Sequence, residues 1–175
     1  MNTGRVVGAN DGAILASFTA DVDFDVVDSA QAIAAELSAH GVDSLDEAAD
    51  VVVSGGNVDV ADAADIQAIS MYNDSASDYD ITDTAAALIS AGDSILNKAG
   101  VDIVTASDTS VNASIGGDLA GFTADIEFDV VDTADLIAAE VTASGFGSGG
   151  LDEANNLIVS GGNVDVADAA DIQAI

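Results

Sequence analysis

The sequence predicts an α/β fold built as a right-handed repeat solenoid, with parallel strands and short helices in each coil and a repeat unit of about 50 residues. Three observations lead to this prediction. The stretch VSGGNVDVADAADIQAI begins at Val53 and again, letter for letter, at Val159. The stretch FTADVDFDVVDSAQAIAAE from Phe18 returns in closely related form from Phe122. Along the chain, strand-like alternation of apolar and acidic residues changes repeatedly to helical spacing.

The repeats divide the chain, taken as one solenoid segment over residues 1–175, into four parts. We expect the end of a preceding repeat at 1–17, repeat 1 at 18–72, a diverged repeat 2 at 73–121 and a truncated repeat 3 at 122–175. Repeat 2 is identified by SDYDITDTAAALIS, in which Tyr79 takes the place of Phe24 and Phe128. A unit so rich in alanine buries little apolar surface alone, so neighbouring coils are expected to supply each other's core.

Each unit is predicted to begin with a strand and a helix. In repeat 1, Val22, Phe24 and Val26 alternate with aspartates, which is typical of a half-buried strand. The helix that follows starts at the motif D-[ST]-A and carries apolar residues four positions apart, such as Ile33 and Leu37. Its expected N-terminal caps are the aspartates of that motif, Asp28, Asp83 and Asp132.

The second half of each unit is predicted to hold two short strands and a brief helix. The second strand covers Val51–Val53 in repeat 1. The motif SGGN, in which Gly55 and Gly56 are expected to take positive φ angles, then turns the chain into a third strand, VDV. The brief helix is expected to be capped at Asp62, or at Asp168 in repeat 3. The longer helices are expected to end where a basic residue precedes a glycine, at His40-Gly41 and at Lys98–Gly100. The predicted coil is thus β–α–β–turn–β–α.

The charge of the chain restricts its partners. It holds 32 acidic residues against two basic ones, with a formal net charge of −30, while 49 % of its residues are hydrophobic. We therefore expect a folded chain with an anionic surface, which excludes nucleic acid and anionic membranes and favours cations or a basic partner. The first residues carry no signal-peptide pattern, and no apolar run is long enough for membrane insertion. Cysteine is absent, so no disulfide is expected.

The acidic face of the predicted strands is the candidate site. Strands stacked about 4.8 Å apart would bring equivalent carboxylates into rows, where adjacent charges repel by roughly 3 kcal/mol before screening. The rows comprise Asp23, Asp78 and Glu127; Asp25, Asp80 and Asp129; and Asp21 with Asp125. Two interpretations stay open, an acidic face that salt screens or a set of Ca²⁺ sites, since Ca²⁺ binds several carboxylate oxygens in tolerant geometry. The motif GGNVD offers further oxygen ligands at Asn57, Asp59 and Asp62, although a glycine turn and a helix cap explain each of its residues.

The sequence predicts no catalytic site. It contains one histidine, no cysteine and two basic side chains, so zinc clusters, thiol nucleophiles and the basic clusters of polysaccharide lyases are missing. His40 is expected to cap a helix end or to lie at the surface. A glycosidase needs only two carboxylates, but no pair of acids here differs from its repeated copies.

The stretches YDITDTAAALISAGDSILNKAGVDIVTASDTS and VDVADAADIQAI are similar to the tandem repeats of large secreted bacterial surface proteins, which are adhesin-like, S-layer-like or RTX-associated. The calcium-binding nonapeptide of RTX proteins is not present. The resemblance implies secretion to the extracellular cell surface without an N-terminal signal peptide, and a structural role as scaffold, spacer or building block of a filament or surface layer. The alternative is a Ca²⁺-dependent adhesion module that binds glycan or a partner surface. Open repeat ends also predict self-association.

Overall fold

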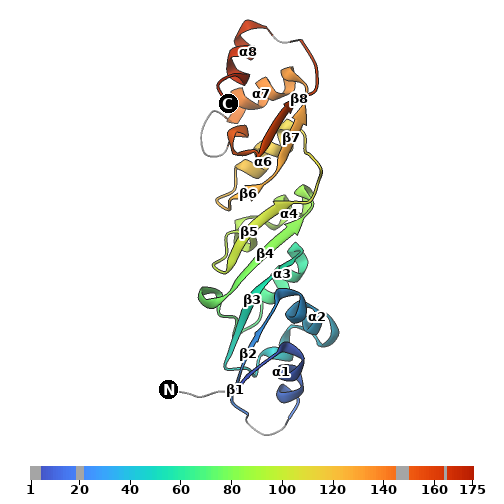
Figure 1. The fold of residues 1–175 in the computed structure, drawn as a ribbon, viewed down its shortest axis with the longest axis vertical. Helices are drawn as coiled ribbons and strands as arrows, with labels where there is room; N and C mark the ends of the chain where they lie inside the picture. The colour runs from blue at the N-terminus through green and yellow to red at the C-terminus, as the bar shows by residue number, and fades with distance from the viewer. Residues whose placement is uncertain (1–4, 19–21, 145–149, 164) are drawn as a thin grey trace. The chain divides into compact units, whose positions relative to one another are not determined.

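Strands and helices alternate along the chain in a computed structural model, which describes residues 5–18, 22–144, 150–163 and 165–175 (Figure 1). The strands are β1 (Arg5–Val7), β2 (Phe24–Asp28), β3 (Asp50–Val58), β4 (Asp78–Asp83), β5 (Val101–Ala106), β6 (Ile126–Glu127), β7 (Asp129–Asp132) and β8 (Asn156–Val159). The α-helices are α1 (Ala9–Ala16), α2 (Ala30–His40), α3 (Val60–Gln67), α4 (Ala85–Ala91), α5 (Asp93–Leu96), α6 (Ala113–Ala120), α7 (Ala134–Ser144) and α8 (Val166–Ile172). Short 3₁₀ helices are η1 (Val42–Leu45), η2 (Asp74–Ala76) and η3 (Leu151–Glu153).

Six strands form one sheet in the order β1-β2-β3-β4-β5-β6, and β7 and β8 form a two-stranded sheet. The described registers are parallel, with Val26 opposite Val51 in the first sheet and Val130 opposite Leu157 in the second. Strands that follow each other in sequence are neighbours in the sheet, so helices serve as the crossover connections that parallel strands require. The predicted α/β class with parallel strands is confirmed.

The coil is simpler than the predicted β–α–β–turn–β–α order. Strand β3 runs through the SGGN motif without ending, and its register with β4 shifts between Ser54 and Asn57. Gly55 and Gly56 take the expected positive φ values, 85° and 101°. These glycines therefore form an irregularity inside one strand, not a turn between two strands. One long strand therefore stands where two short strands were predicted.

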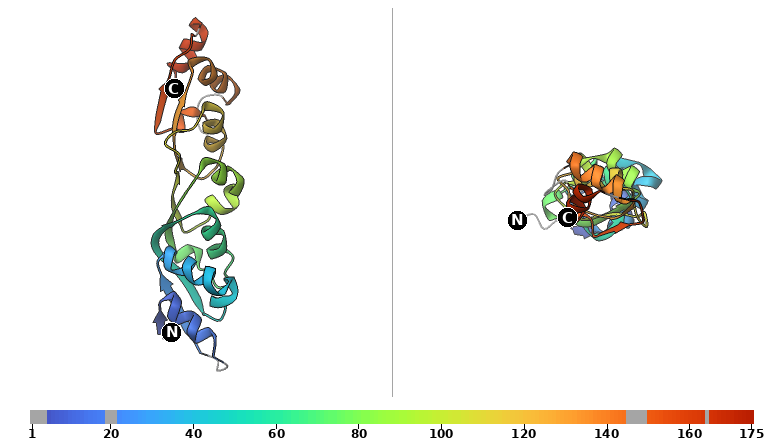
Figure 2. Two further views of the ribbon diagram at one scale, coloured as in Figure 1. Left: turned by 90° about the vertical axis from the view of Figure 1, so that its right-hand side faces the viewer. Right: turned by 90° about the horizontal axis from the view of Figure 1, so that it is seen from above.

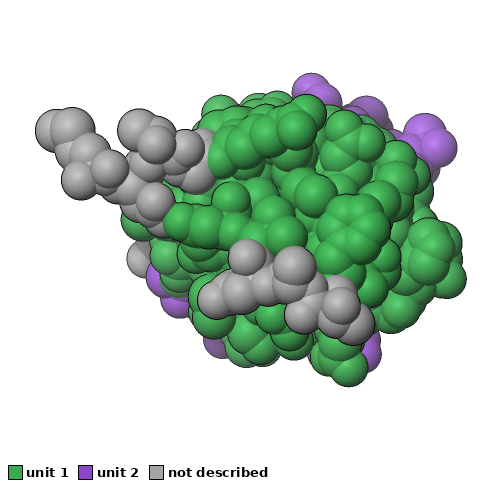
Figure 3. All heavy atoms as spheres, turned by 90° about the horizontal axis from the view of Figure 1, so that it is seen from below, with its two compact units in different colours: residues 1–82, 94–103 green, residues 83–93, 104–175 purple. Residues whose placement is uncertain are grey.

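The chain divides into two compact units, coloured green and purple in Figure 3. Unit 1 comprises residues 1–82 and 94–103, and unit 2 comprises residues 83–93 and 104–175. Within unit 1, helices α1, α2 and α3 lie on one side of the strands, and within unit 2, α6 and α7 do the same (Figure 2, left). Each unit therefore has a two-layer arrangement in which helices cover one face of the strands.

The core of each unit lies between strands and helices. The buried residues of unit 1 include Phe24 and Val26 from β2, and Ile33 and Leu37 from α2. The equivalent residues of unit 2 are also buried, namely Phe128, Val130, Ile137 and Val141. Burial of each large apolar side chain stabilises the fold by about 1.5–3 kcal/mol relative to exposure. The predicted apolar faces of these strands and helices are confirmed.

Glycine allows one helix in each unit to lie close to its strands. A Cβ atom on Gly12 of α1 would lie 2.7 Å from Cγ2 of Val26, and one on Gly116 of α6 would lie 2.7 Å from Cγ2 of Val130. Carbon atoms in favourable contact lie about 3.5–4.0 Å apart. Any side chain at these two positions would therefore push the helix away from the strand.

The ends of the longer helices confirm one prediction and correct another. His40 is the last residue of α2, and Gly41 closes that helix with a φ of 89°. The predicted helix before Lys98 is divided by Gly92, whose φ is 69°, and its second part ends at Leu96. Lys98 thus lies beyond the helix end that it was expected to cap. None of the helices described is both long enough and apolar enough to cross a membrane.

The caps of the brief helices lie three residues earlier than predicted. Asp59, not Asp62, caps α3, since its side chain accepts a hydrogen bond from the Asp62 N–H. Asp165, not Asp168, caps α8 in the same way. Each identical copy of the sequence therefore begins its helix with the same local contact.

Two tyrosines of unit 1 have phenol groups whose pKa is raised by folding. Tyr79 of β4 is 1 % exposed, and its hydroxyl accepts a hydrogen bond of 2.8 Å from Gln67 Nε2. The Tyr72 hydroxyl lies 3.5 Å from the carbonyl oxygen of Ala99. Burial disfavours the charged phenolate and is the main reason why the pKa of each tyrosine is raised.

We predict that unit 1 loses stability as the pH rises above about 10, the pKa of a free tyrosine. Below this pH, both phenols are protonated in the folded and in the unfolded chain, so their contribution is fully present. Above it, the unfolded chain releases protons first, and the free energy of unfolding falls until the folded phenols also titrate. Urea unfolding from about pH 8 to pH 12 measures this slope, which Tyr79→Phe should reduce. A free energy of unfolding that stays constant over this range would contradict the prediction.

Candidate functional site

The predicted Ca²⁺ ligands lie in or just before four strands. Asp25 belongs to β2, Asp78 and Asp80 to β4, Glu127 to β6 and Asp129 to β7, while Asp23 and Asp125 precede β2 and β6. Asp21 lies outside the residues that the structure describes. The acids on β2 and β4 belong to unit 1, and those on β6 and β7 belong to unit 2.

The acidic strands of unit 1 are not adjacent, because β3 lies between β2 and β4. The sheet partner of Asp25 is Asp50 of β3, not Asp80. Neighbouring strands lie about 4.8 Å apart, so the strands of Asp25 and Asp80 are separated by roughly twice that distance. The predicted rows of directly adjacent carboxylates are therefore wrong in unit 1. The prediction aligned β2 with β4 because their sequences are similar. It did not take into account that β3, whose sequence differs, lies between them.

Hydrogen-bond donors stand beside several of these acids. The partner of Asp80 in the sheet is Asn57, and the N–H of Ile103 donates to Asp80 Oδ1 at 3.3 Å. In unit 2, Asp129 is opposite Asn156, whose Nδ2 donates to Asp129 Oδ1 at 2.8 Å. A neutral amide opposite a carboxylate removes one charge repulsion and adds a hydrogen bond. At Asp80 and Asp129, a donor from the chain itself thus offsets part of the charge repulsion.

The pairing of β2 with β3 in unit 1 places two aspartates opposite each other. Asp25 and Asp50 are partners on β2 and β3, and Asn73 Nδ2 donates to Asp50 Oδ2 at 3.0 Å. Unit 2 has Asp129 and Asn156 in the equivalent places. Over residues 5–18, 22–144, 150–163 and 165–175, no three His, Cys, Asp or Glu side chains are grouped to hold a metal ion. Ca²⁺ binding stays a prediction, and Asp25 with Asp50 is the pair on which to test it.

The polar groups of GGNVD take part in structural hydrogen bonds. Asn57 Nδ2 donates to Thr82 Oγ1 at 2.7 Å, and the Asn57 carbonyl accepts from Gln31 Nε2 at 2.7 Å. Asp59 Oδ1 accepts from the Asp62 N–H at 2.9 Å. Burial, followed by the negative charge of Asp59, raises the pKa of Asp62. These contacts support a strand irregularity and a helix cap as the role of this motif.

Aspartates at strand ends have a role that the sequence did not predict. The expected caps of α2 and α4 were Asp28 and Asp83, but the next residues, Ser29 and Thr84, are the caps. The Asp28 carboxylate accepts the N–H of Ser29 at 2.8 Å through Oδ1 and the N–H of Ala9 at 3.0 Å through Oδ2. Ala9 is the first residue of α1, the helix that precedes β2 in the chain. Asp28 therefore joins the end of β2 to the start of α1, and we call this contact the strand-end bridge.

The strand-end bridge recurs twice in unit 2. Asp132 accepts the N–H of Thr133 at 2.8 Å and the N–H of Ala113, the first residue of α6, at 3.0 Å. Asp108, just after β5, accepts the N–H of Ala85, the first residue of α4, at 2.6 Å. Amides in the first turn of a helix have no acceptor within the helix. For Asp28 and Asp132, the sequence signal for this role was the aspartate of the motif D-[ST]-A. Asp108 lies outside that motif.

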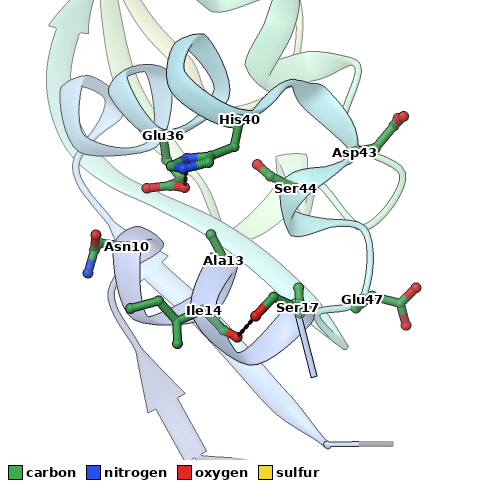
Figure 4. A pocket seen from close by; sticks show the side chains of 10 residues that line it. Asn10, Ala13, Ile14, Ser17, Glu36, His40, Asp43, Ser44 and Glu47 are labelled. Atoms are coloured by element: carbon green, nitrogen blue, oxygen red, sulfur yellow. Dashed lines mark hydrogen bonds and ion pairs between the residues drawn. The ribbon is translucent and has the colours of Figure 1, made fainter. Parts of the chain in front are cut away.

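A pocket of unit 1 lies between α1, α2 and η1, with a volume of about 540 Å³ (Figure 4). Ile14 contributes an apolar wall, and Glu36, only 7 % exposed, holds its Oε1 atom 2.5 Å from His40 Nδ1. In the equivalent place of unit 2, the Ser144 hydroxyl donates to Glu140. Both copies thus give this glutamate a partner one helical turn later, which indicates a structural role for His40.

A scan against protein-family models and searches of curated proteins and solved structures find no match. Function is therefore inferred from the residues themselves. The described contacts that recur along the chain are structural, and they involve strand ends, helix caps and helix turns.

We predict that Asp132→Ala lowers the free energy of unfolding by about 1–3 kcal/mol, because the first amide of α6 and the amide of Thr133 lose their acceptor. The matched control is Asp118→Ala, which removes the same charge from an exposed position on α6. It should change stability by less than about 0.5 kcal/mol. Urea unfolding of the full chain compares the two variants. Equal effects would show that charge removal, not the strand-end bridge, governs the result.

Proposed function

We propose that this chain is a structural repeat segment of an extracellular bacterial surface protein, acting as a scaffold, spacer or building block of a filament or surface layer. The observation that carries the proposal is the strand-end bridge, in which Asp28, Asp108 and Asp132 each bind the first amide of a helix in the preceding coil. A contact that recurs with the coil serves the architecture of the chain. A reaction site, in contrast, needs one set of groups that differs from its copies.

The strand–helix coils are proposed to stack as a right-handed solenoid, with two coils in each repeat of about 50 residues. The strand order of the six-stranded sheet, which follows the sequence, supports this proposal. Parallel strand–helix–strand connections are right-handed in almost all proteins. In such an array each coil depends on its neighbours for caps and core, so a longer array can be built from the same contacts.

The proposed role needs neither catalysis nor nucleic acid. The chain has one histidine, and His40 is paired with Glu36. A net charge of −30 repels other anions and keeps a surface segment hydrated in salt. The proposed location, secreted at the cell surface, follows from the resemblance of the repeats to those of secreted surface proteins.

We expect small-angle X-ray scattering to show an extended particle. A globular chain of 175 residues has a radius of gyration of about 16 Å. Stacked coils predict a clearly larger value and a rod-like scattering profile, measured in about 0.5 M NaCl to screen repulsion between molecules. A radius of gyration near the globular value would contradict the solenoid.

A Ca²⁺-dependent adhesion module that binds glycan or a partner surface is the second candidate, favoured by the facing carboxylates of Asp25 and Asp50. For this candidate we predict a higher melting temperature in millimolar CaCl₂ than in NaCl of the same ionic strength, because a divalent ion can bind between two carboxylates. Asp50→Asn, which copies Asn156 of unit 2, should abolish the difference, and Asp118→Asn should preserve it. Equal melting temperatures in the two salts would leave charge screening alone and remove this candidate.

A further inference from the structure

The pocket between α1, α2 and η1 contains two buried polar atoms that have no hydrogen-bond partner. They are Oε1 of Glu36, on α2, and Oγ of Ser44, on η1. Buried polar side-chain atoms in proteins usually have such a partner. Among residues 5–18, 22–144, 150–163 and 165–175, these two atoms are the buried side-chain oxygens and nitrogens that lack one. The pocket is therefore a place where the described chain can still bind a hydrogen-bonding group.

His40 contacts the Glu36 carboxylate from the rim of the pocket (Figure 4). Its Nδ1 atom lies 2.5 Å from Glu36 Oε1, which is an ion pair when the imidazole is protonated. This contact does not have the geometry of a hydrogen bond, so Oε1 can still accept one. The His40 side chain is 62 % exposed, whereas Glu36 is buried. In Figure 4, the Ser44 hydroxyl points toward the side of the pocket where these two residues lie.

The glutamate of unit 1 is placed differently from its copy in unit 2. In the repeat alignment, Ala13 corresponds to Gly117 and Glu36 corresponds to Glu140. A Cβ atom on Gly117 would overlap the Glu140 carboxylate, so that carboxylate lies against α6 where the glycine leaves room. Ala13 has a Cβ atom at this place, and Glu36 lies beside His40 instead. Unit 1 thus has a set of groups here that its copy does not share.

The other residues that line the pocket favour a cation with an apolar chain. Asp43 and Glu47 add negative charge, and none of the described lining residues is a lysine or an arginine. Ala13 and Ile14 of α1 provide apolar surface. The volume of about 540 Å³ lies within the range of about 300–1,000 Å³ that is usual for small-ligand pockets. An alkylammonium group combines an apolar chain with three N–H donors and a positive charge.

We propose that this pocket binds an alkylammonium group, with the ammonium at Glu36 and Ser44 and the alkyl chain against Ala13 and Ile14. One N–H of the ammonium donates to Glu36 Oε1, and a second is available for Ser44 Oγ. Hydrogen bonds between ionised groups are about twice as strong as those between neutral ones. Such a group occurs in free alkylamines and in the lysine side chains of other proteins. This ligand site goes beyond the proposed scaffold and does not rest on it.

The two probes are n-pentylamine and a lysine blocked at both backbone ends, which share the same five-carbon chain and ammonium. Each is titrated against the full chain at about pH 8, where alkylamines are protonated, in about 0.15 M NaCl. We expect saturable binding of one probe per chain, seen by NMR as shifts of the Ser44 and His40 amide signals. Blocked lysine that binds at least as tightly as n-pentylamine identifies a lysine side chain as the ligand. Tighter binding of n-pentylamine identifies a free amine.

A control probe separates hydrogen bonding from charge attraction. Pentyltrimethylammonium has the same chain and the same charge but no N–H donor. It should bind about tenfold or more weakly than n-pentylamine, because Glu36 Oε1 and Ser44 Oγ then receive no hydrogen bond. Equal binding of the two cations would show that they respond only to the negative charge of the chain, and would contradict the proposal.

Chain variants locate the site. Glu36→Gln, which keeps the shape of the side chain and removes its charge, should weaken n-pentylamine binding about tenfold or more. The matched control is Glu140→Gln, the same change at the equivalent glutamate of unit 2, which should alter binding less than about twofold. Ser44→Ala tests the same pocket without changing a buried charge, and should weaken binding about threefold or more. Circular dichroism checks that all three variants are folded.

Either of two results would overturn the ligand site. The first is the absence of saturable shifts at Ser44 and His40 with both probes, which would leave water as the partner of the two buried atoms. The second is equal weakening of binding by Glu36→Gln and Glu140→Gln. Neither result concerns the strand-end bridge, so the proposed scaffold would stand.

Discussion

The first amides of a helix have no acceptor within that helix, and in this chain a carboxylate at the end of the following strand supplies one. Asp28 does so for Ala9, and Asp132 does so for Ala113, in both cases while also accepting the amide of the next residue. This double contact holds a strand end against the start of the preceding helix, beside the apolar layer that strand and helix share.

The same stacking concentrates negative charge, and amide side chains reduce the resulting repulsion. Asn156 binds Asp129, and Asn73 binds Asp50, each with a donor where a further carboxylate would repel. The two units differ at one register, where Asp25 is opposite Asp50 in unit 1 and Asp129 is opposite Asn156 in unit 2. A chain with a net charge of −30 can therefore pair strands in parallel where an amide donor lies beside an aspartate, because the donor replaces a second negative charge.

Sequence patterns predicted local structure well, because burial along one strand and the φ angle of a glycine depend mainly on nearby residues. Alternation placed Phe24 and Val26 in the core, and the glycine pair predicted the positive φ values of Gly55 and Gly56. Contacts between coils were not predictable in the same way. Similarity aligned the strand of Asp25 with that of Asp80, whereas the neighbour of Asp25 is Asp50, on a strand of different sequence. The pairing of Glu36 with His40 was accessible from their spacing of one helical turn, but its burial depends on helix packing.

The coupling of each strand end to the preceding helix through a carboxylate is most directly tested by amide hydrogen exchange measured by NMR at Ala9 and Ala113. Helix-starting amides normally exchange fast, since they bind water. The strand-end bridge predicts slow exchange at both residues. It also predicts that Asp28→Ala accelerates exchange at Ala9, which belongs to a different element from Asp28, while exchange at Ala113 is unchanged. Exchange at Ala9 as fast as in an unfolded peptide, or unaffected by Asp28→Ala, would contradict it.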